Sequence, residues 1–291
     1  MNQIELKALA KINLGLDVLG RRENGYHDVR MVMQSIYLYD EVKIAKKKKP
    51  GITLTTNLKF LPTGDGNIAY KAAQLLMDEF DLKEGVQITL NKHIPVAAGL
   101  AGGSSNAAAV LFGMNRLFGL RLTQQELMDR GVKLGADVPY CIMRGTVLAE
   151  GIGEILTPLP ACPKCHVLIA KPPISVSTKL VYEKLDSHEI ENHPDIDGII
   201  DGLYDQDITK VASRMGNVLE KVTIEEYPVI EQIKNVMKEQ GALNAMMSGS
   251  GPTVFGLYET KEKARKAAAK IREKQLAKQV YVTGIHNARR K

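Results

Sequence analysis

A run of small residues between Pro95 and Ala109 is the part of the sequence best suited to chemistry. Glycines at 99, 102 and 103 permit close approach of the backbone, and a helical pattern of apolar residues follows directly. The first turn of a helix leaves its amide groups without internal partners, and the helix dipole adds partial positive charge there. The pattern therefore predicts a site for polyphosphate.

Two serines at the end of this loop extend the prediction. The hydroxyls of Ser104 and Ser105 can cap the helix and contact phosphate or a magnesium ion. A plain helix cap after a flexible turn is the alternative. The segment is neither the GxxxxGK[ST] loop of P-loop enzymes nor a dinucleotide fingerprint, because it lies past residue 95 and has no lysine in place.

Composition bounds the class of protein that carries this loop. A chain of 291 residues with 44% hydrophobic content can form two domains or one large one. The net charge of +6 suits nucleic acid, an anionic membrane face or a polyphosphate substrate. Apolar runs stop well short of the roughly 20 residues that a membrane span needs, so we expect a cytoplasmic protein without a membrane partner.

Three cysteines, Cys141, Cys162 and Cys165, give an odd number in a chain without an export signal. We therefore expect reduced thiols. Cys162 and Cys165 form a CxxC pair followed by His166, but no second pair completes a zinc site, which leaves zinc or redox chemistry as the less favoured alternative. The lysines from Lys46 to Lys49 are interpreted as a solvated hairpin tip, and the tail of Arg289, Arg290 and Lys291 as a frayed terminus.

Hydrophobic periodicity predicts both helices and strands. Strands are expected at residues 4–18, 42–44, 52–56, 86–90, 146–148, 167–170, 252–258 and 280–283. Helices are expected at residues 67–80, 123–134, 230–240 and 262–274, and after the glycine loop with a buried stripe of Ala107, Val110, Leu111, Met114 and Phe118. These elements follow no regular βα rhythm, so the fold class is α+β. A change of character near Thr157 to Pro163 predicts domains at 1–157 and 158–291.

Three motifs in order resemble those of the GHMP kinase superfamily. They are Ala10-Lys11-Ile12-Asn13-Leu14, the loop from Pro95 to Ala109, and Met247-Ser248-Gly249-Ser250-Gly251-Pro252-Thr253. Two further segments, Gly25-Tyr26-His27 and Gly135-Ala136-Asp137-Val138-Pro139, are similar to the diphosphocytidyl-methylerythritol kinases in particular. The resemblance implies a two-domain fold, with an N-terminal nucleotide-binding domain like ribosomal protein S5 and a C-terminal α+β substrate domain.

The resemblance also implies roles for individual residues. Asp137 would be the general base, and Lys11 beside it would keep the aspartate ionised and ease formation of the alkoxide. ATP would be the donor, with Mg²⁺ bridging its phosphates and Ser105 as a metal ligand. The implied ATP-binding residues are Pro95, Gly99, Leu100, Ala101, Gly102, Gly103, Ser104, Ser105 and Lys92, and the implied substrate-binding residues are Asn13, Tyr26, His27, Tyr182, Gly249 and Ser250. Ala101 stands where many relatives carry glycine, and its methyl group is expected to be tolerable if φ is negative.

The activity implied is ATP-dependent phosphorylation of the 2-hydroxyl of 4-diphosphocytidyl-2-C-methylerythritol, a small cytidylyl substrate, in isoprenoid biosynthesis. Homoserine, mevalonate and sugar kinases share the three motifs and remain an alternative with a different acceptor. A non-catalytic protein that keeps the fold and binds nucleic acid through its basic surface is the alternative from another class. We expect no nucleic-acid partner, and the sequence leaves the oligomeric state open.

Overall fold

The structure, a computed structural model, describes residues 2–188, 190 and 192–288, so the predicted basic tail lies outside it. The chain forms two compact units. Unit 1 comprises Met1–Ala10, Leu38–Val96 and Ala101–Met143, and unit 2 comprises Lys11–Tyr37, Ala97–Leu100 and Arg144–Lys291. Both units mix helices and strands, which confirms the α+β class. The division into residues 1–157 and 158–291 stays a prediction, because compactness groups residues by packing and not by continuity of the chain.

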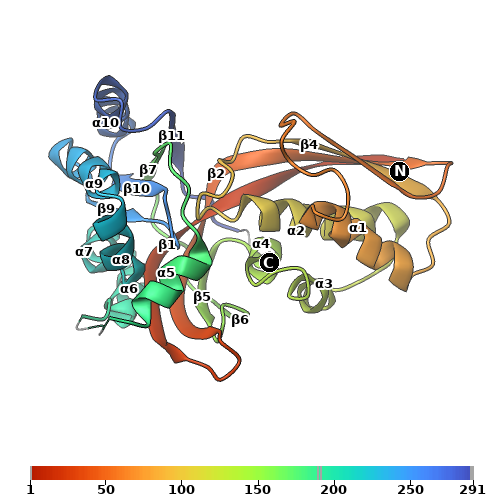
Figure 1. Cartoon of the computed structure of the whole chain (residues 1–291), viewed down its shortest axis with the longest axis horizontal. Helices are drawn as coiled ribbons and strands as arrows, with labels where there is room; N and C mark the ends of the chain where they lie inside the picture. Colours follow the sequence, from red (N-terminus) through yellow and green to blue (C-terminus); the bar gives the residue numbers. More distant parts are fainter. Residues whose placement is uncertain (1, 189, 191, 289–291) are drawn as a thin grey trace. The chain divides into compact units, whose positions relative to one another are not determined.

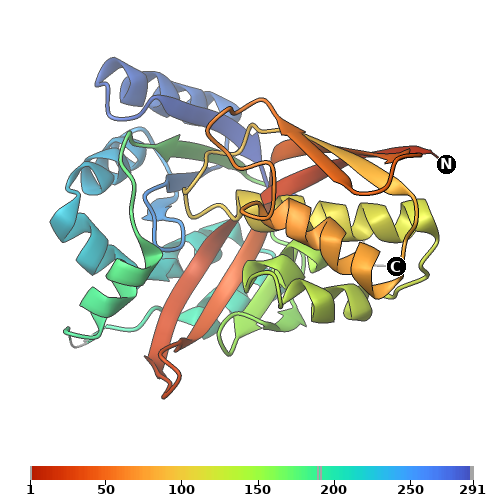
Figure 2. The same ribbon diagram turned by 45° about the vertical axis from the view of Figure 1, so that its right-hand side comes forward.

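Unit 1 is a sheet with helices packed on it. It takes the first part of β1 (Gln3–Arg21) and the last part of β2 (His27–Lys47), and adds β3 (Ile52–Thr56), α1 (Ile68–Glu79), β4 (Gly85–Asn91), α2 (Gly102–Phe118), α3 (Gln124–Gly131) and α4 (Asp137–Met143). The strand order is β3-β4-β2-β1. Helices α1 and α2 lie side by side against this sheet (Figures 1 and 2).

Small residues let α2 approach the sheet closely. A Cβ at Gly113 would lie 2.4 Å from a methyl of Ile44 and 3.1 Å from one of Leu6, so a larger residue there would displace these side chains. The predicted buried stripe is correct except at its end, where Phe118 is half-exposed and Leu117 is buried instead. The ring of Phe118 lies 4.4 Å below the amine of Lys46. The buried face moves from position 118 to position 117 because an α-helix repeats every 3.6 residues and not every four.

The lysine run does not form a hairpin tip, which corrects the prediction. β3 pairs in parallel with β4, and β4 separates it from β2, so the turn after Lys47 joins two strands that are not neighbours. Lys46 forms an ion pair with Glu84 at 2.8 Å, whereas Lys48 and Lys49 are exposed. The turn residues Pro50 and Gly51 suggest a hairpin, but pairing with a later strand decides the topology.

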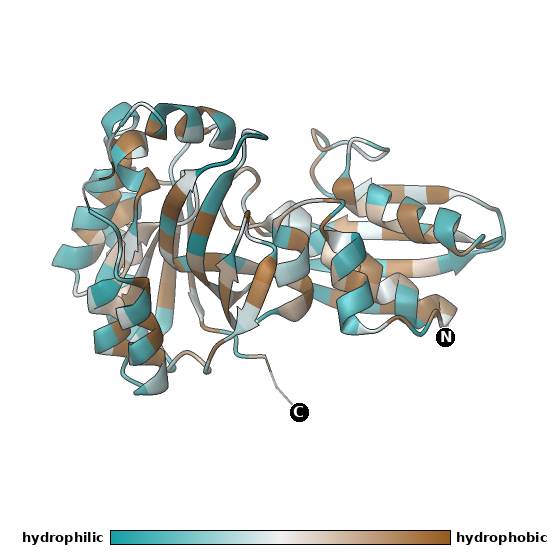
Figure 3. Cartoon of the chain, turned by 90° about the horizontal axis from the view of Figure 1, so that it is seen from below, coloured by the Kyte–Doolittle hydropathy of each residue, from teal (hydrophilic) through white to brown (hydrophobic). Residues whose placement is uncertain are grey.

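Unit 2 contains a second, antiparallel sheet of order β11-β7-β10-β9, with α9 and α10 against it (Figure 1). The elements added after residue 143 are β5 (Thr146–Glu150), β6 (Ile155–Pro158), β7 (His166–Lys171), α5 (Thr178–Leu185), α6 (Ile196–Tyr204), α7 (Ile208–Arg214), β8 (Gly216–Asn217), α8 (Leu219–Glu226), α9 (Val229–Glu239), β9 (Asn244–Met247), β10 (Val254–Tyr258), α10 (Lys261–Glu273) and β11 (Gln279–Gly284). Figure 3 shows helices that are hydrophobic on one side and hydrophilic on the other.

The part of β1 in unit 2 lies between β8 and β2, and α6 packs on it. β8 pairs in parallel with β1 through Gly15 and Leu16. A Cβ at Gly15 would lie 2.6 Å from a methyl of Ile196 and 2.7 Å from one of Ile199, so glycine allows α6 to pack on the strand. β2 begins at His27, far earlier than the predicted strand at residues 42–44.

None of the helices in the described residues is long and apolar enough to cross a membrane.

Candidate active site

The glycine loop has an unusual backbone. Positive φ angles alternate with other conformations at Ala97 (49°), Gly99 (70°) and Ala101 (54°). Alternation of right- and left-handed residues turns successive amide groups toward one side and creates a concavity for anions. Helix α2 begins at Gly102, and the amide of Ser105 is bonded to the carbonyl of Ala101 at 2.8 Å. The first-turn amides before it have no earlier carbonyl within the helix.

Neither serine caps α2, which corrects the predicted capping role. The N-cap is Ala101, and it makes no side-chain bond to the helix. Ser105 is buried, and its hydroxyl donates to the carbonyl of Leu9 at 2.6 Å, so it fastens the helix start to β1. The condition under which the methyl group of Ala101 was expected to be tolerable, a negative φ, is not met, because this residue occupies the left-handed region.

Replacement of Ala101 by glycine is expected to stabilise the protein by about 1 kcal/mol, because a Cβ in the left-handed region costs about 1–2 kcal/mol. Ala108→Gly, in the interior of the same helix, is the matched control and should destabilise by about 1 kcal/mol or more. Chemical denaturation of both variants measures the difference. Equal losses in the two variants would contradict the left-handed strain at Ala101.

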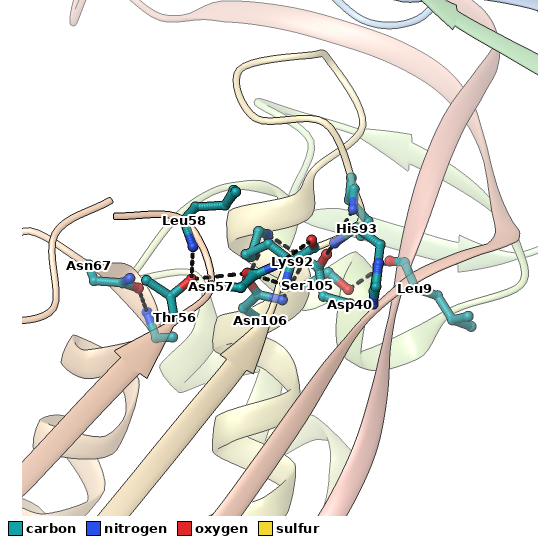
Figure 4. Close-up of polar contacts among 12 residues, drawn as sticks. Leu9, Asp40, Thr56, Asn57, Leu58, Asn67, Lys92, His93, Ser105 and Asn106 are labelled. Atoms are coloured by element: carbon teal, nitrogen blue, oxygen red, sulfur yellow. Dashed lines mark hydrogen bonds and ion pairs between the residues drawn. The ribbon is translucent and has the colours of Figure 1, made fainter. Parts of the chain in front are cut away.

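A buried ion pair lies behind the start of α2 (Figure 4). Lys92 donates to the carboxylate of Asp40 and, at 2.8 Å, to the amide oxygen of Asn106. The other oxygen of Asp40 accepts the amides of His93 at 2.7 Å and Ile94 at 2.8 Å. Asp40 is fully buried, and each of its oxygens has two donors.

This network fixes the segment that enters the loop. Asn57 clamps the backbone of Lys92, donating to its carbonyl at 3.1 Å and accepting its amide at 2.8 Å. A Cβ at Gly102 would lie 3.3 Å from the amine of Lys92. The contact between Lys92 and ATP stays a prediction. The amine of Lys92 already donates hydrogen bonds to Asp40 and Asn106. Sequence reasoning missed Asp40, although it occurs in an alternating strand with Leu38 and Val42.

Within unit 2, the first and third motifs meet. Lys11 is buried on β1, its amine donates to the amide oxygen of Asn13 at 2.7 Å, and its backbone amide donates to the carbonyl of Leu100 at 3.2 Å. The hydroxyl of Ser248 donates to the carbonyl of Gly99 at 3.0 Å. A Cβ at Gly249 would lie 3.5 Å from the amine of Lys11. One ammonium group therefore lies beside two glycine-containing loops.

A second cluster in unit 2 contains His27 and Tyr182, two of the side chains that the resemblance implies for substrate binding. The rings of His27 and Tyr182 lie 4.8 Å apart at an interplanar angle of 34°. The Nε2 atom of His27 lies 2.6 Å from Asp186, which fixes the orientation of the imidazole. Tyr26 is 59% exposed at the preceding turn. Asp186 was not predicted, because it follows α5, which is distant in sequence from His27.

Ser250 and Asp137, two further predicted site residues, are placed by contacts with their immediate surroundings. The hydroxyl of Ser250 lies 2.7 Å from that of Thr178, the first residue of the helix that carries Tyr182. Asp137 is half-buried and begins α4, after a turn in which the amide of Val138 donates to the carbonyl of Gly135 at 3.1 Å. Asp137 belongs to unit 1 and Lys11 to unit 2, so their pairing stays a prediction.

Metal and thiol chemistry have little support in the side chains. Ser105 does not fit a magnesium ligand well, because it is buried and its hydroxyl proton is bound to Leu9. The described residues contain no group of three histidine, cysteine or acidic side chains able to hold a metal ion. Burial raises the pKa of Cys165 to about 12 and raises the pKa of Cys162 even further. Burial therefore disfavours the thiolate form that redox chemistry needs.

Comparison with known proteins identifies the family. The pattern described as GHMP kinases N terminal domain matches residues 67–145, and that described as GHMP kinases C terminal matches residues 199–277. The 4-diphosphocytidyl-2-C-methyl-D-erythritol kinase of Lachnospira eligens is 60% identical over 97% of this chain and 98% of its own length. The chain belongs to this family of GHMP kinases. The enzyme of the same name from Lachnoclostridium phytofermentans is 55% identical over 97% of each chain.

Solved structures of GHMP kinases share the fold. A crystal structure of a 4-(cytidine 5'-diphospho)-2C-methyl-D-erythritol kinase matches with a TM-score of 0.84 at 30% identity, over 98% of this chain and 100% of that chain. Homoserine kinase from Cytophaga hutchinsonii matches with a TM-score of 0.76 at 20% identity, over 98% and 95% of the two chains. At that identity the likeness shows the fold alone, so it does not favour a homoserine acceptor.

Proposed function

We propose that this protein transfers the γ-phosphoryl group of ATP to the 2-hydroxyl of 4-diphosphocytidyl-2-C-methyl-D-erythritol. The observation that carries the proposal is 60% identity to a kinase of that name over nearly the whole chain. The local geometry of the three motifs supports it, since the glycine loop has the alternating backbone of an anion cradle and Lys11 lies beside Gly249.

Each part of the site has a proposed task. The amides of the loop and of the first turn of α2 hold the phosphates of ATP. The carboxylate of Asp137 accepts the proton of the acceptor hydroxyl, and the ammonium group of Lys11 offsets the negative charge that develops. Asn13 holds the amine of Lys11 in place. Mg²⁺ would bind the phosphates of ATP and neutralise their charge; no protein ligand is assigned to it.

The test is release of ADP by the purified protein with three acceptors, namely the cytidylyl substrate, homoserine and mevalonate. Turnover with the cytidylyl substrate alone is the expected result. Turnover with another acceptor would change the proposed substrate but not the reaction. Absence of turnover together with salt-sensitive binding of nucleic acid would favour the non-catalytic alternative. A cytoplasmic location and the absence of nucleic-acid and membrane partners stay predictions.

The cluster of His27 and Tyr182 is proposed to hold the cytosine base. Removal of the ring in Tyr182→Ala is expected to raise KM for the cytidylyl substrate about threefold to tenfold, because an aromatic pair contributes about 0.5–1.5 kcal/mol. KM for ATP should stay unchanged, and Tyr182→Phe should behave like the wild type. Tyr204, which is 68% exposed on α6, supplies the control variant Tyr204→Ala. An unchanged KM in Tyr182→Ala would exclude stacking on this ring.

A further inference from the structure

The second glycine loop, Ser248 to Gly251, is held by a buried side chain that belongs to none of the three motifs. Asn217, at the end of β8, is 7% exposed. Its side-chain nitrogen donates to the carbonyl of Met247 at 3.0 Å and to the carbonyl of Gly249 at 2.8 Å. Its side-chain oxygen accepts the amide of Leu219 at 3.0 Å, which fixes the orientation of the carboxamide.

Three successive carbonyl groups at the start of this loop, from residue 247 to residue 249, accept hydrogen bonds. Asn217 binds those of Met247 and Gly249, and the carbonyl of Ser248 accepts the amide of Gly251 at 3.0 Å. Within the part of the chain that the structure describes, the amides of Gly249 and Ser250 donate no hydrogen bond, although both residues are buried. Buried amides need an acceptor. These two amides are therefore available for an anion.

The residue that holds the loop is itself paired, through its backbone, with the strand of Lys11. Asn217 pairs with Leu16 of β1, and the amide of the next residue, Val218, donates to the carbonyl of Leu16 at 3.1 Å. The loop that Asn217 holds comes close to Lys11, whose amine would lie 3.5 Å from a Cβ at Gly249. Asn217 therefore sets the loop amides relative to the ammonium group.

A half-buried carboxylate holds the strand that leads into the loop. Glu220, one helical turn after Asn217, accepts the amide of Met247 at 2.7 Å. Its other oxygen lies 3.1 Å from the amine of Lys234 on α9, which fixes the carboxylate. Both backbone groups of Met247 are thus bound by side chains from one segment, residues 217–220.

We propose that Asn217 is a positioning residue, which holds the carbonyls of Met247 and Gly249 so that the amides of Gly249 and Ser250 bind the transferring phosphoryl group. The proposal rests on the proposed kinase function. Loss of a preorganised donor to developing negative charge lowers kcat about 10²–10³-fold in other enzymes. Because Asn217 acts through the loop and touches no substrate, a smaller loss is expected.

The test compares Asn217→Asp with Asn244→Asp. Asn244 begins β9 and donates to the carbonyl of Ala212 at 2.7 Å, so its variant breaks a similar bond at the other end of the same strand. Aspartate at 217 cannot donate and repels both carbonyls. We expect kcat to fall about 10- to 100-fold in Asn217→Asp, with KM for both substrates within about threefold. Asn244→Asp should keep the wild-type kcat.

A binding readout separates this proposal from the proposed function. In the wild type and in Asn244→Asp, the NMR signals of the Gly249 and Ser250 amides should shift when a non-hydrolysable ATP analogue is added, and in Asn217→Asp they should not. If the wild type turns over and Asn217→Asp has the kcat of Asn244→Asp, the positioning role is wrong. If the wild type turns over no acceptor, the kinase proposal fails and the NMR comparison alone decides the role of Asn217. Asn217→Ala, which adds no charge, serves if the aspartate variant does not fold.

Discussion

Replacement of Asp137 by asparagine is expected to lower kcat by about 10²–10⁴-fold, the usual contribution of a general base. Asparagine has the same shape but cannot accept the proton of the acceptor hydroxyl. It is also a good residue for a helix start, so α4, which begins at position 137, should form as before. Steady-state release of ADP measures kcat, and calorimetry with ADP checks that nucleotide binding is retained.

Asp129 supplies the matched control. It lies on α3, is exposed and accepts a bond from Gln125 at 2.8 Å. Asp129→Asn makes the same chemical change outside the proposed site and should keep full activity. If Asp137→Asn retained more than a tenth of the wild-type kcat, another group would have to accept the proton. The pairing of Lys11 with Asp137 would then lose its role in the reaction.

The largest loss of stability is expected for Asp40→Asn, at about 3–5 kcal/mol, because removal of one partner leaves the other charge buried and unpaired. The ammonium group of Lys92 would face a neutral amide, and two of the four donors around position 40 would meet an NH₂ group instead of an oxygen. Denaturant unfolding measures the free energy of unfolding directly.

An exposed pair gives the comparison. Asp28 forms an ion pair with Arg22 at 2.6 Å, with both side chains in contact with solvent, so Asp28→Asn should have a small effect. The double variant Asp40→Asn, Lys92→Met removes the unpaired charge and should recover part of the stability lost in the single variant. A loss in Asp40→Asn no larger than that in Asp28→Asn would mean that the network contributes little.

Much of the fold follows from local pattern. Alternation along β1 and helical spacing in α1, α9 and α10 predicted these elements close to their observed bounds. The errors come from pairing between distant segments. The turn after Lys47 has the residues of a hairpin, but β3 pairs with β4, which lies about thirty residues later in the chain. No local pattern encodes that choice, because both arrangements satisfy the same turn.

Site residues that lie in sequence motifs could be predicted. Residues that hold those motifs in place through hydrogen bonds, such as Asp40 and Asn217, were not predicted. Asp40 shares the inward parity of Leu38 and Val42 in β2, so strict alternation would have placed a carboxylate in the core and required a cation for it. Asn217 gave no such signal, because its bonds go to a loop thirty residues away. The left-handed conformation of Ala101 contradicts the ordinary preference of alanine, and the surrounding structure imposes it.

The interleaving of the two units has a consequence for dissection of the chain. Unit 2 needs Lys11–Tyr37, which supplies the strand beside β8 and the glycine on which α6 rests. A fragment cut at residue 157 would separate that strand from its partners and leave an apolar helix face open to water. Expressed alone, the carboxyl-terminal piece should aggregate, and the two pieces mixed before refolding should rescue each other. Genetic shuffling between such kinases should therefore exchange whole chains, because neither unit is a continuous module.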